Sequence, residues 1–121
     1  MSLTNYGENR ILGLYSGDGK HYLALVTAAP GEAGGGTEVS GGAYARQEVT
    51  FAAASNGSMK NSAAIEFPTA TANWGTAVAW GLYDAATGGN LVWYGAIDTP
   101  KDLLAGDIYR INTGNLTLKM D

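Results

Sequence analysis

Short apolar segments separated by turn residues recur along this chain, and they constrain its fold more than any other feature. Residues 21–27 form a continuous apolar run of strand length, which is expected of a central strand covered on both faces. Residues 47–52 and 64–67 alternate apolar with polar side chains, the period of a half-buried strand. Gly, Asn and Pro separate these segments. The pattern predicts a chain made mostly of β-strands.

Two pairs of neighbouring strands are predicted to form hairpins. Residues 76–83 and 90–97 flank a Gly-Gly connection, and residues 107–111 and 115–119 flank Asn-Thr-Gly. Short strands joined by such turns favour an antiparallel β-sandwich or a jelly-roll-like fold. We therefore predict a mostly β fold with a short N-terminal helix.

The helix is expected within residues 1–18. Thr4 is suited to cap its N-terminus, Glu8 lies in the first turn where the helix dipole favours an acid, and Gly17 would end it. A partial apolar stripe on this helix comprises Leu3, Tyr6, Ile11, Leu14 and Tyr15.

The length and charge of the chain exclude several classes of protein. Its 121 residues fit one domain, predicted to span 1–121, and the absence of cysteine excludes disulfide frameworks and thiolate metal sites. A net charge of −4 argues against nucleic-acid or anionic-membrane binding. No apolar run is long enough for a membrane span, and the first residues lack the pattern of a secretion signal. Folding in the cytoplasm is the simplest expectation.

The surface is expected to carry little charge. Charged residues make up 15% of the chain, against a typical share of about 25%. A surface of Ala, Gly, Ser and Thr suits close contact with other chains, where desolvating charges would be costly. The alternative is a loop-rich monomer with small side chains.

Residues 28–46 form a long glycine-rich loop with few apolar residues. Loops of this length are uncommon in small domains and are usually binding loops or linkers. We expect residues 31–42 to dock onto a neighbouring chain, with Val39, Tyr44 and Arg46 as contact residues, because Tyr and Arg are enriched at the centres of interfaces.

Three tryptophans and several tyrosines lie in the second half of the chain. Trp80 and Trp93 are in phase with neighbouring apolar residues and are predicted to face the core. Trp74 lies in a turn-like segment and is the predicted exposed anchor of an interface.

No catalytic constellation is apparent. The one histidine, His21, begins an apolar strand and is expected to be structural or solvated, and no Gly-x-Ser-x-Gly elbow is present. Residues 13–20 fail the phosphate-loop pattern, and the acids lack calcium-loop spacing. A pair of carboxylates brought together by the fold remains open as a glycosidase alternative. We expect no cofactor, no metal and no enzymatic activity.

The chain resembles a family of small bacteriophage proteins known as tail fibre proteins. The resemblance covers nearly all of the chain after Lys20 and is carried by residues 22–31, 37–47, 67–75, 81–91 and 105–107. It implies a non-enzymatic component of the virion that is assembled in the host cytoplasm.

This resemblance and the low charge lead to a functional hypothesis with two alternatives. The hypothesis is a subunit of the tail tip, baseplate or fibre attachment that contacts other virion proteins and copies of itself, with a trimer favoured because closed rings remove exposed sheet edges. The alternatives are a capsid decoration protein and a carbohydrate-binding module that recognises a host-surface glycan through exposed aromatic rings. No long shaft is expected, because the sequence has no internal repeat.

Overall fold

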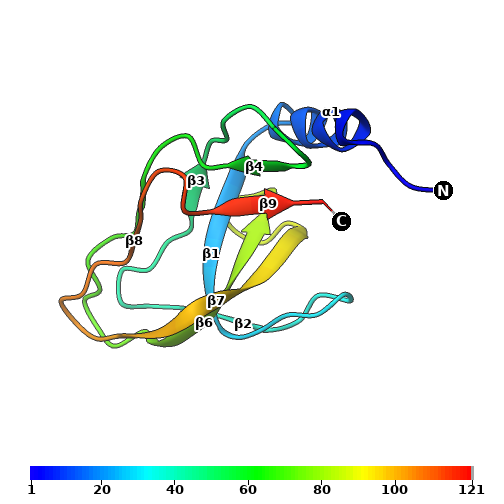
Figure 1. Cartoon of the computed structure of the whole chain (residues 1–121). Coiled ribbons are helices and arrows are strands. Elements are labelled where there is room, and N and C mark those ends of the chain that lie inside the picture. The colour runs from blue at the N-terminus through cyan, green and yellow to red at the C-terminus, as the bar shows by residue number, and fades with distance from the viewer. Residues whose placement is uncertain (121) are drawn as a thin grey trace.

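A computed structural model describes residues 1–120, and β1 (His21–Ala28) is the centre of its largest sheet (Figure 1). On one side β1 pairs antiparallel with β6 (Gly75–Tyr83), which in turn pairs with the edge strand β7 (Leu91–Leu103). On its other side β1 pairs with β3 (Gln47–Val49) near its start and with β2 (Thr37–Glu38) near its end. The central strand predicted from the apolar run is therefore confirmed.

Two short antiparallel ladders complete the strands. β4 (Ser58–Lys60) pairs with β9 (Thr117–Lys119), and β5 (Ile65–Glu66) pairs with β8 (Arg110–Ile111). Together with the helix α1, β4 and β9 lie across from β6 and β7 (Figure 1). The mostly β, antiparallel class with one N-terminal helix is confirmed. Among the described residues the second layer consists of separate ladders, so a true sandwich or jelly roll stays a prediction.

One hydrophobic core fills the space between these layers. It takes residues from nearly the whole chain, from Leu12 on α1 to Leu118 on β9. Its largest fully buried side chains include Phe67, Leu23 and Leu25. Because the core residues come from many short elements, each element is held mainly by tertiary packing.

The helix α1 (Asn5–Ser16) begins where the sequence predicts. The Thr4 Oγ1 accepts a hydrogen bond of 3.1 Å from the Gly7 N–H, the expected capping contact. The fully buried residue of α1 is Leu12, which the partial apolar stripe did not include. Of the stripe, Tyr15 packs against the core, whereas the exposed members are Leu3, Tyr6, Ile11 and Leu14.

The first predicted hairpin is confirmed. β6 and β7 pair antiparallel, with Leu82 opposite Trp93 and Trp80 opposite Gly95. β7 continues beyond the expected end at residue 97 as far as Leu103. Pro100 is tolerated because β7 is an edge strand, where its missing N–H interrupts no second ladder.

The second predicted hairpin is wrong. The two segments beside residues 112–114 pair with β5 and β4 instead of with each other. The reason is the side chain of Asn61, which is 1% exposed. Its Nδ2 donates to the carbonyls of Ala63 and Asn112, and its Oδ1 accepts from the Leu116 N–H at 2.9 Å. The amide thus takes up backbone groups that a hairpin would have paired.

Candidate functional site

The structure brings two of the predicted contact residues, Tyr44 and Arg46, together with Glu38 in one hydrogen-bonded cluster. Arg46 donates from Nε and Nη2 to the two carboxylate oxygens of Glu38, both at 2.9 Å. Its Nη1 donates to the carbonyls of Ala85 and Gly88 at 2.8 and 2.7 Å. The guanidinium carbon also lies 3.7 Å from the centre of the Tyr83 ring. Arg46 therefore ties the glycine-rich loop to the β6–β7 turn through strong, charge-assisted bonds.

Tyr44 completes this cluster from the core side. Its hydroxyl donates to Glu38 Oε2 at 2.6 Å and accepts from the Leu25 N–H at 3.1 Å. Burial would raise the pKa of Glu38, but the hydrogen bonds from Arg46 and Tyr44 lower it below its ordinary value. Burial and the neighbouring Glu38 raise the pKa of the Tyr44 hydroxyl. The carboxylate stays ionised and the phenol stays neutral, so this cluster locks the loop and offers no poised acid–base pair.

The expectation that Trp74 is exposed is wrong. The residue is 6% exposed, and its Nε1 donates to the Gly42 carbonyl at 2.8 Å. Gly42 has φ 58°, and a Cβ there would lie 2.7 Å from the Trp74 nitrogen, so the close contact requires glycine. The sequence suggested a surface turn because Trp74 follows polar residues, but its indole reaches back under the loop.

Val39 is also internal to the chain. It is 5% exposed and its N–H donates to the Leu25 carbonyl at 3.0 Å. Residues 37–46 are thus ordered by contacts with their own chain. An interface role stays a prediction for the four predicted contact residues, which are Val39, Tyr44, Arg46 and Trp74. Residues 29–36 form an arm that projects from the body (Figure 1), closed by reciprocal hydrogen bonds of 2.9 Å between Gly31 and Gly34. The Tyr94 hydroxyl on β7 donates to Glu32 Oε2 of this arm at 3.1 Å. Docking onto a neighbour stays a prediction for this arm.

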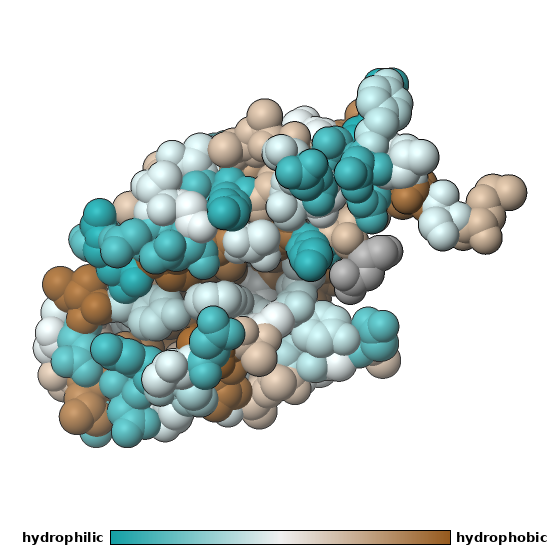
Figure 2. Space-filling view, viewed as in Figure 1, coloured by the Kyte–Doolittle hydropathy of each residue, from teal (hydrophilic) through white to brown (hydrophobic). Residues whose placement is uncertain are grey.

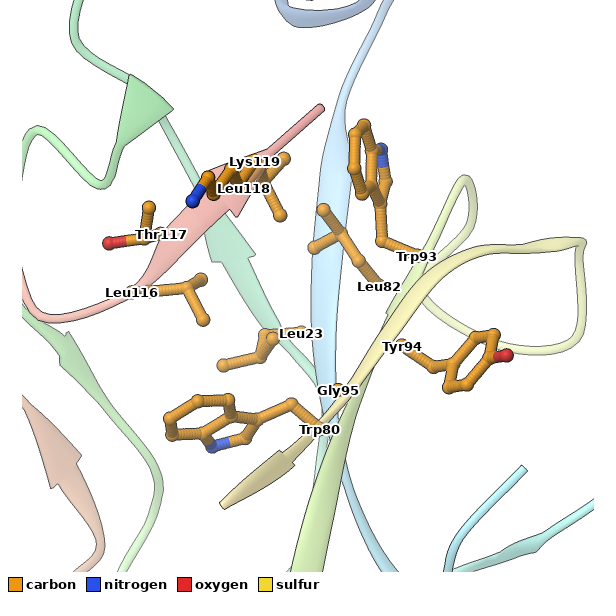
Figure 3. Close-up of a pocket in the computed structure, with 10 residues that line it drawn as sticks. All are labelled: Leu23, Trp80, Leu82, Trp93, Tyr94, Gly95, Leu116, Thr117, Leu118 and Lys119. Atoms are coloured by element: carbon orange, nitrogen blue, oxygen red, sulfur yellow. The ribbon is translucent and has the colours of Figure 1, made fainter. Parts of the chain in front are cut away.

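An apolar groove of about 230 Å³ lies between the main sheet and β9. The space-filling view shows the hollow between the two layers (Figure 2). In Figure 3, Leu118 from β9 and Leu116 just before it point toward Leu23 and Leu82 of the sheet, while Tyr94 points away from the groove. Trp80 and Trp93 face the core, as predicted, and also line this groove as half-buried rings. No sequence pattern predicts this groove, because its walls come from four strands.

The outer edge of β7 adjoins this groove. Within residues 1–120, β7 pairs with β6 alone, so the backbone groups on its other side have no strand partner. No residue from 85 to 97 is charged. Val92 and Tyr94 are each 45% exposed. A long uncharged edge of this kind is one that natural proteins usually protect.

Two further titratable side chains, His21 and Tyr15, lie together inside the fold. His21 is buried, its Nε2 lies 3.3 Å from the Ser16 carbonyl, and its ring stacks near Tyr15 with centroids 4.3 Å apart. The structural interpretation of this histidine is thus the correct one. Burial raises the pKa of Tyr15 to about 12, with a smaller effect from Asp84. Residues 1–120 contain no group of three metal-ligating side chains and no helix able to cross a bilayer.

Comparison with known families gives these surfaces a context. The family model described as podophage GP4 fiber I protein gp80 matches residues 2–119. The chain belongs to this gp80 family. Among curated proteins none matches the chain. The resemblance to phage tail fibre proteins is thereby confirmed, and the chain is a structural component of a phage particle.

The edge of β7 and the stripe on α1 carry exposed apolar side chains, whereas the cluster around Arg46 is bonded within the chain. This gp80-family chain exposes nine large hydrophobic side chains among its described residues: Met1, Leu3, Tyr6, Ile11, Leu14, Val92, Tyr94, Leu104 and Ile108.

Proposed function

We propose that the chain is a non-catalytic adaptor subunit of the phage fibre, located at the tail tip, baseplate or fibre attachment. It acts by packing against other virion proteins and copies of itself after assembly in the host cytoplasm. The observation that carries this proposal is the contrast between its polar and apolar groups. The Arg46 cluster is satisfied internally, whereas large apolar side chains on α1 and β7 face solvent.

This contrast favours an assembly role over catalysis. Single exposed hydrophobic residues are normal on a monomer, but exposed rows on one helix and one sheet edge mark contact surfaces. The described residues hold no metal-ligand group, and the most strongly bonded carboxylate, Glu38, is held ionised by Arg46. A trimer remains our proposed closed state of self-association, and its mass in solution tests it.

A phage that lacks this chain tests the adaptor role. We expect such particles to keep intact, DNA-filled heads but to lose fibre density and adsorb poorly to the host, and complementation by the parent gene should restore both. A capsid decoration protein predicts the reverse result: fibres are retained while heads rupture on heating. Normal fibres and normal adsorption would contradict the proposal.

Recognition of a host-surface glycan is the other candidate role. The buried Trp74 removes the ring on which that hypothesis rested most, and Tyr94 and Tyr6 are the exposed aromatic residues that remain. Their rings are single rather than paired in a cleft, which supports assembly over sugar binding. Specific retention on a glycan array that disappears in Tyr94→Ala would reverse this preference.

A further inference from the structure

We propose that Asn56 is a site of spontaneous deamidation, and that the docked helix α1 controls the rate of the reaction. Deamidation converts an asparagine to aspartate or isoaspartate through attack by the backbone nitrogen of the next residue. In this chain that nitrogen belongs to Gly57, and it is hydrogen-bonded to Asn9 of α1. The inference is independent of the proposed fibre role, since it depends only on the chemistry of one turn and its contact with the helix.

The turn that precedes β4 carries the pair of residues on which this reaction is fastest. A glycine after an asparagine reacts most readily, because it has no side chain to hinder the approach of its nitrogen. Asn56 is the only asparagine of the sequence that is followed by glycine. Its side chain is exposed, so hydroxide and water can reach it. The sequence and the exposure therefore single out this position.

The backbone of the turn is held in a two-residue hairpin. The angle φ is 52° at Asn56 and 76° at Gly57, which are left-handed values of the kind that a type I′ turn requires. Reciprocal backbone hydrogen bonds of 2.8 and 3.1 Å join Ser55 and Ser58 across the turn. The Met120 N–H donates to the Gly57 carbonyl at 2.9 Å. The peptide that must rearrange is thus bonded on both sides.

The helix holds the attacking atom itself. Asn9 Oδ1 accepts a hydrogen bond of 2.8 Å from the Gly57 N–H. The Glu8 carboxylate packs against the same glycine, where a Cβ would lie 2.6 Å from Glu8 Oε1. The hydrogen bond favours the protonated nitrogen, and a carboxylate beside it disfavours the amide anion that must form. Docked α1 therefore slows the reaction, and movement of α1 away from the turn permits it.

The bonds that form and break are those of a succinimide. Hydroxide removes the Gly57 amide proton, and the nitrogen attacks Cγ of Asn56. The new N–C bond closes a five-membered ring, while the bond from Cγ to the side-chain nitrogen breaks and ammonia leaves with a proton from water. Water then opens the ring at one of its two carbonyls and gives isoaspartate or aspartate. The net change replaces NH2 by OH, and nothing is oxidised or reduced.

The product holds α1 less tightly than the parent chain does. Isoaspartate lengthens the backbone of the turn by one methylene, which displaces the Gly57 N–H from its acceptor on Asn9. Both products also place a new carboxylate next to the Gly57–Glu8 contact, where like charges repel. Each modified chain thus loses part of the contact that docks its helix.

Peptide mass spectrometry tests the site and its control by α1. The full chain is incubated under warm, mildly alkaline conditions and digested, and fragmentation distinguishes isoaspartate from aspartate at position 56. We expect Asn9→Ala to react about fivefold faster than the parent, the effect of losing one ordinary hydrogen bond. Asn9→Asp keeps an acceptor at the same place and should stay near the parental rate.

Three controls show whether the effect belongs to this contact. Asn5→Ala changes an exposed asparagine at the start of the same helix and should react at the parental rate. Asn61 precedes a small residue too, but its amide is hydrogen-bonded in the interior, so it should stay unmodified in every folded chain. The parent unfolded in urea should react at Asn56 faster than the folded parent, and circular dichroism should show that the variants are folded.

Two results would overturn the control by α1: equal rates in folded Asn9→Ala and the parent, or a folded parent that reacts as fast as the unfolded chain. An asparagine that persists at position 56 in the unfolded chain would overturn the site itself. In the purified isoaspartate form, hydrogen exchange should quicken in α1 more than in β1. Unchanged exchange would contradict the weakened docking, and none of these results bears on the fibre role.

Discussion

The Arg46–Glu38 pair is the residue-scale contact that holds the glycine-rich loop on the body. The Arg46 side chain is 7% exposed and that of Glu38 is 26% exposed. Arg46→Ala would leave the carboxylate half-buried without its partner, so we expect a loss of about 2–4 kcal/mol in the free energy of unfolding, measured by urea denaturation. Arg110→Ala is the matched control, because its pair with Glu66 is more than half exposed and contributes about 1 kcal/mol or less. Equal losses in both variants would contradict this account of the loop.

The pH dependence of stability follows from Glu38, the carboxylate of the Arg46–Glu38 pair. The folded-state pKa of Glu38 lies below its usual value of 4.5. Ionised Glu38 therefore stabilises the fold above about pH 4.5, and this stabilisation is lost as the pH falls through the lowered pKa. In Glu38→Gln the unfolding free energy should decrease less steeply than in the parent over this acidic range. An unchanged slope in Glu38→Gln would assign the acid sensitivity to other carboxylates, such as Asp84, whose pKa is lowered by hydrogen bonds from Asn90.

The contacts of single side chains were the least predictable part of the chain. Thr4 as N-cap was predictable, since its role depends on the next three residues alone. The burial of Trp74 was not, because its partner Gly42 is distant in sequence and forms the contact only when the loop folds back. The Arg46–Glu38 pair likewise gave no sequence signal, as it joins two residues of a loop without a regular period.

At the scale of elements, the helix α1 carries one fully buried residue, Leu12, close to residues that are exposed. Leu12 is fully buried, whereas Leu14 is 65% exposed. We expect Leu12→Ala to lower the free energy of unfolding by about 2–5 kcal/mol and Leu14→Ala to change it by about 0.5 kcal/mol or less. Thermal melts of the two variants at low concentration provide the comparison. A larger effect from Leu14→Ala would show that the stripe, and not Leu12, attaches the helix.

The side-chain amide of Asn61 fixes the segment that joins the last two strands, β8 and β9. Asn61→Ala would remove the acceptor of the Leu116 N–H and the donor to two carbonyls, so we expect a loss of about 2–4 kcal/mol in unfolding free energy. Hydrogen exchange should quicken in β9 and β8 more than in β1. Asn115→Ala, an exposed position in the same turn, should leave both measurements close to the parent. Unchanged exchange in Asn61→Ala would contradict this role.

The strands and their turns were more predictable than their partners. A continuous apolar run located β1, the apolar segments on either side of the Gly-Gly connection located β6 and the start of β7, and that connection predicted the hairpin of β6 and β7. The last strands were assigned to the wrong partners because local sequence favours the nearest pairing, whereas β8 and β9 pair with strands more than forty residues earlier, as their contacts with Glu66 and Lys60 show. The groove depends on those distant pairings and was therefore invisible in the sequence.

At the scale of the whole molecule, the fold presents exposed apolar side chains around a core in which the Arg46 cluster and the Asn61 amide are hydrogen-bonded. The α1 stripe, the β7 edge and the groove are formed by different elements. The polar cluster at Arg46 ties the glycine-rich loop to the β6–β7 turn. We propose that a gp80-family chain built this way stands between other polypeptides of the particle. The low charge of the sequence led to this proposal, and the structure shows which large apolar side chains are exposed.

The position of the chain in an intact particle tests this account most directly. Electron cryomicroscopy of purified virions, resolved well enough to trace β1, β6 and β7, should find the chain within the fibre assembly, with other polypeptide covering the α1 stripe and the β7 edge. Copies seated on the capsid, or copies in the fibre whose α1 and β7 surfaces remain open to solvent, would contradict it.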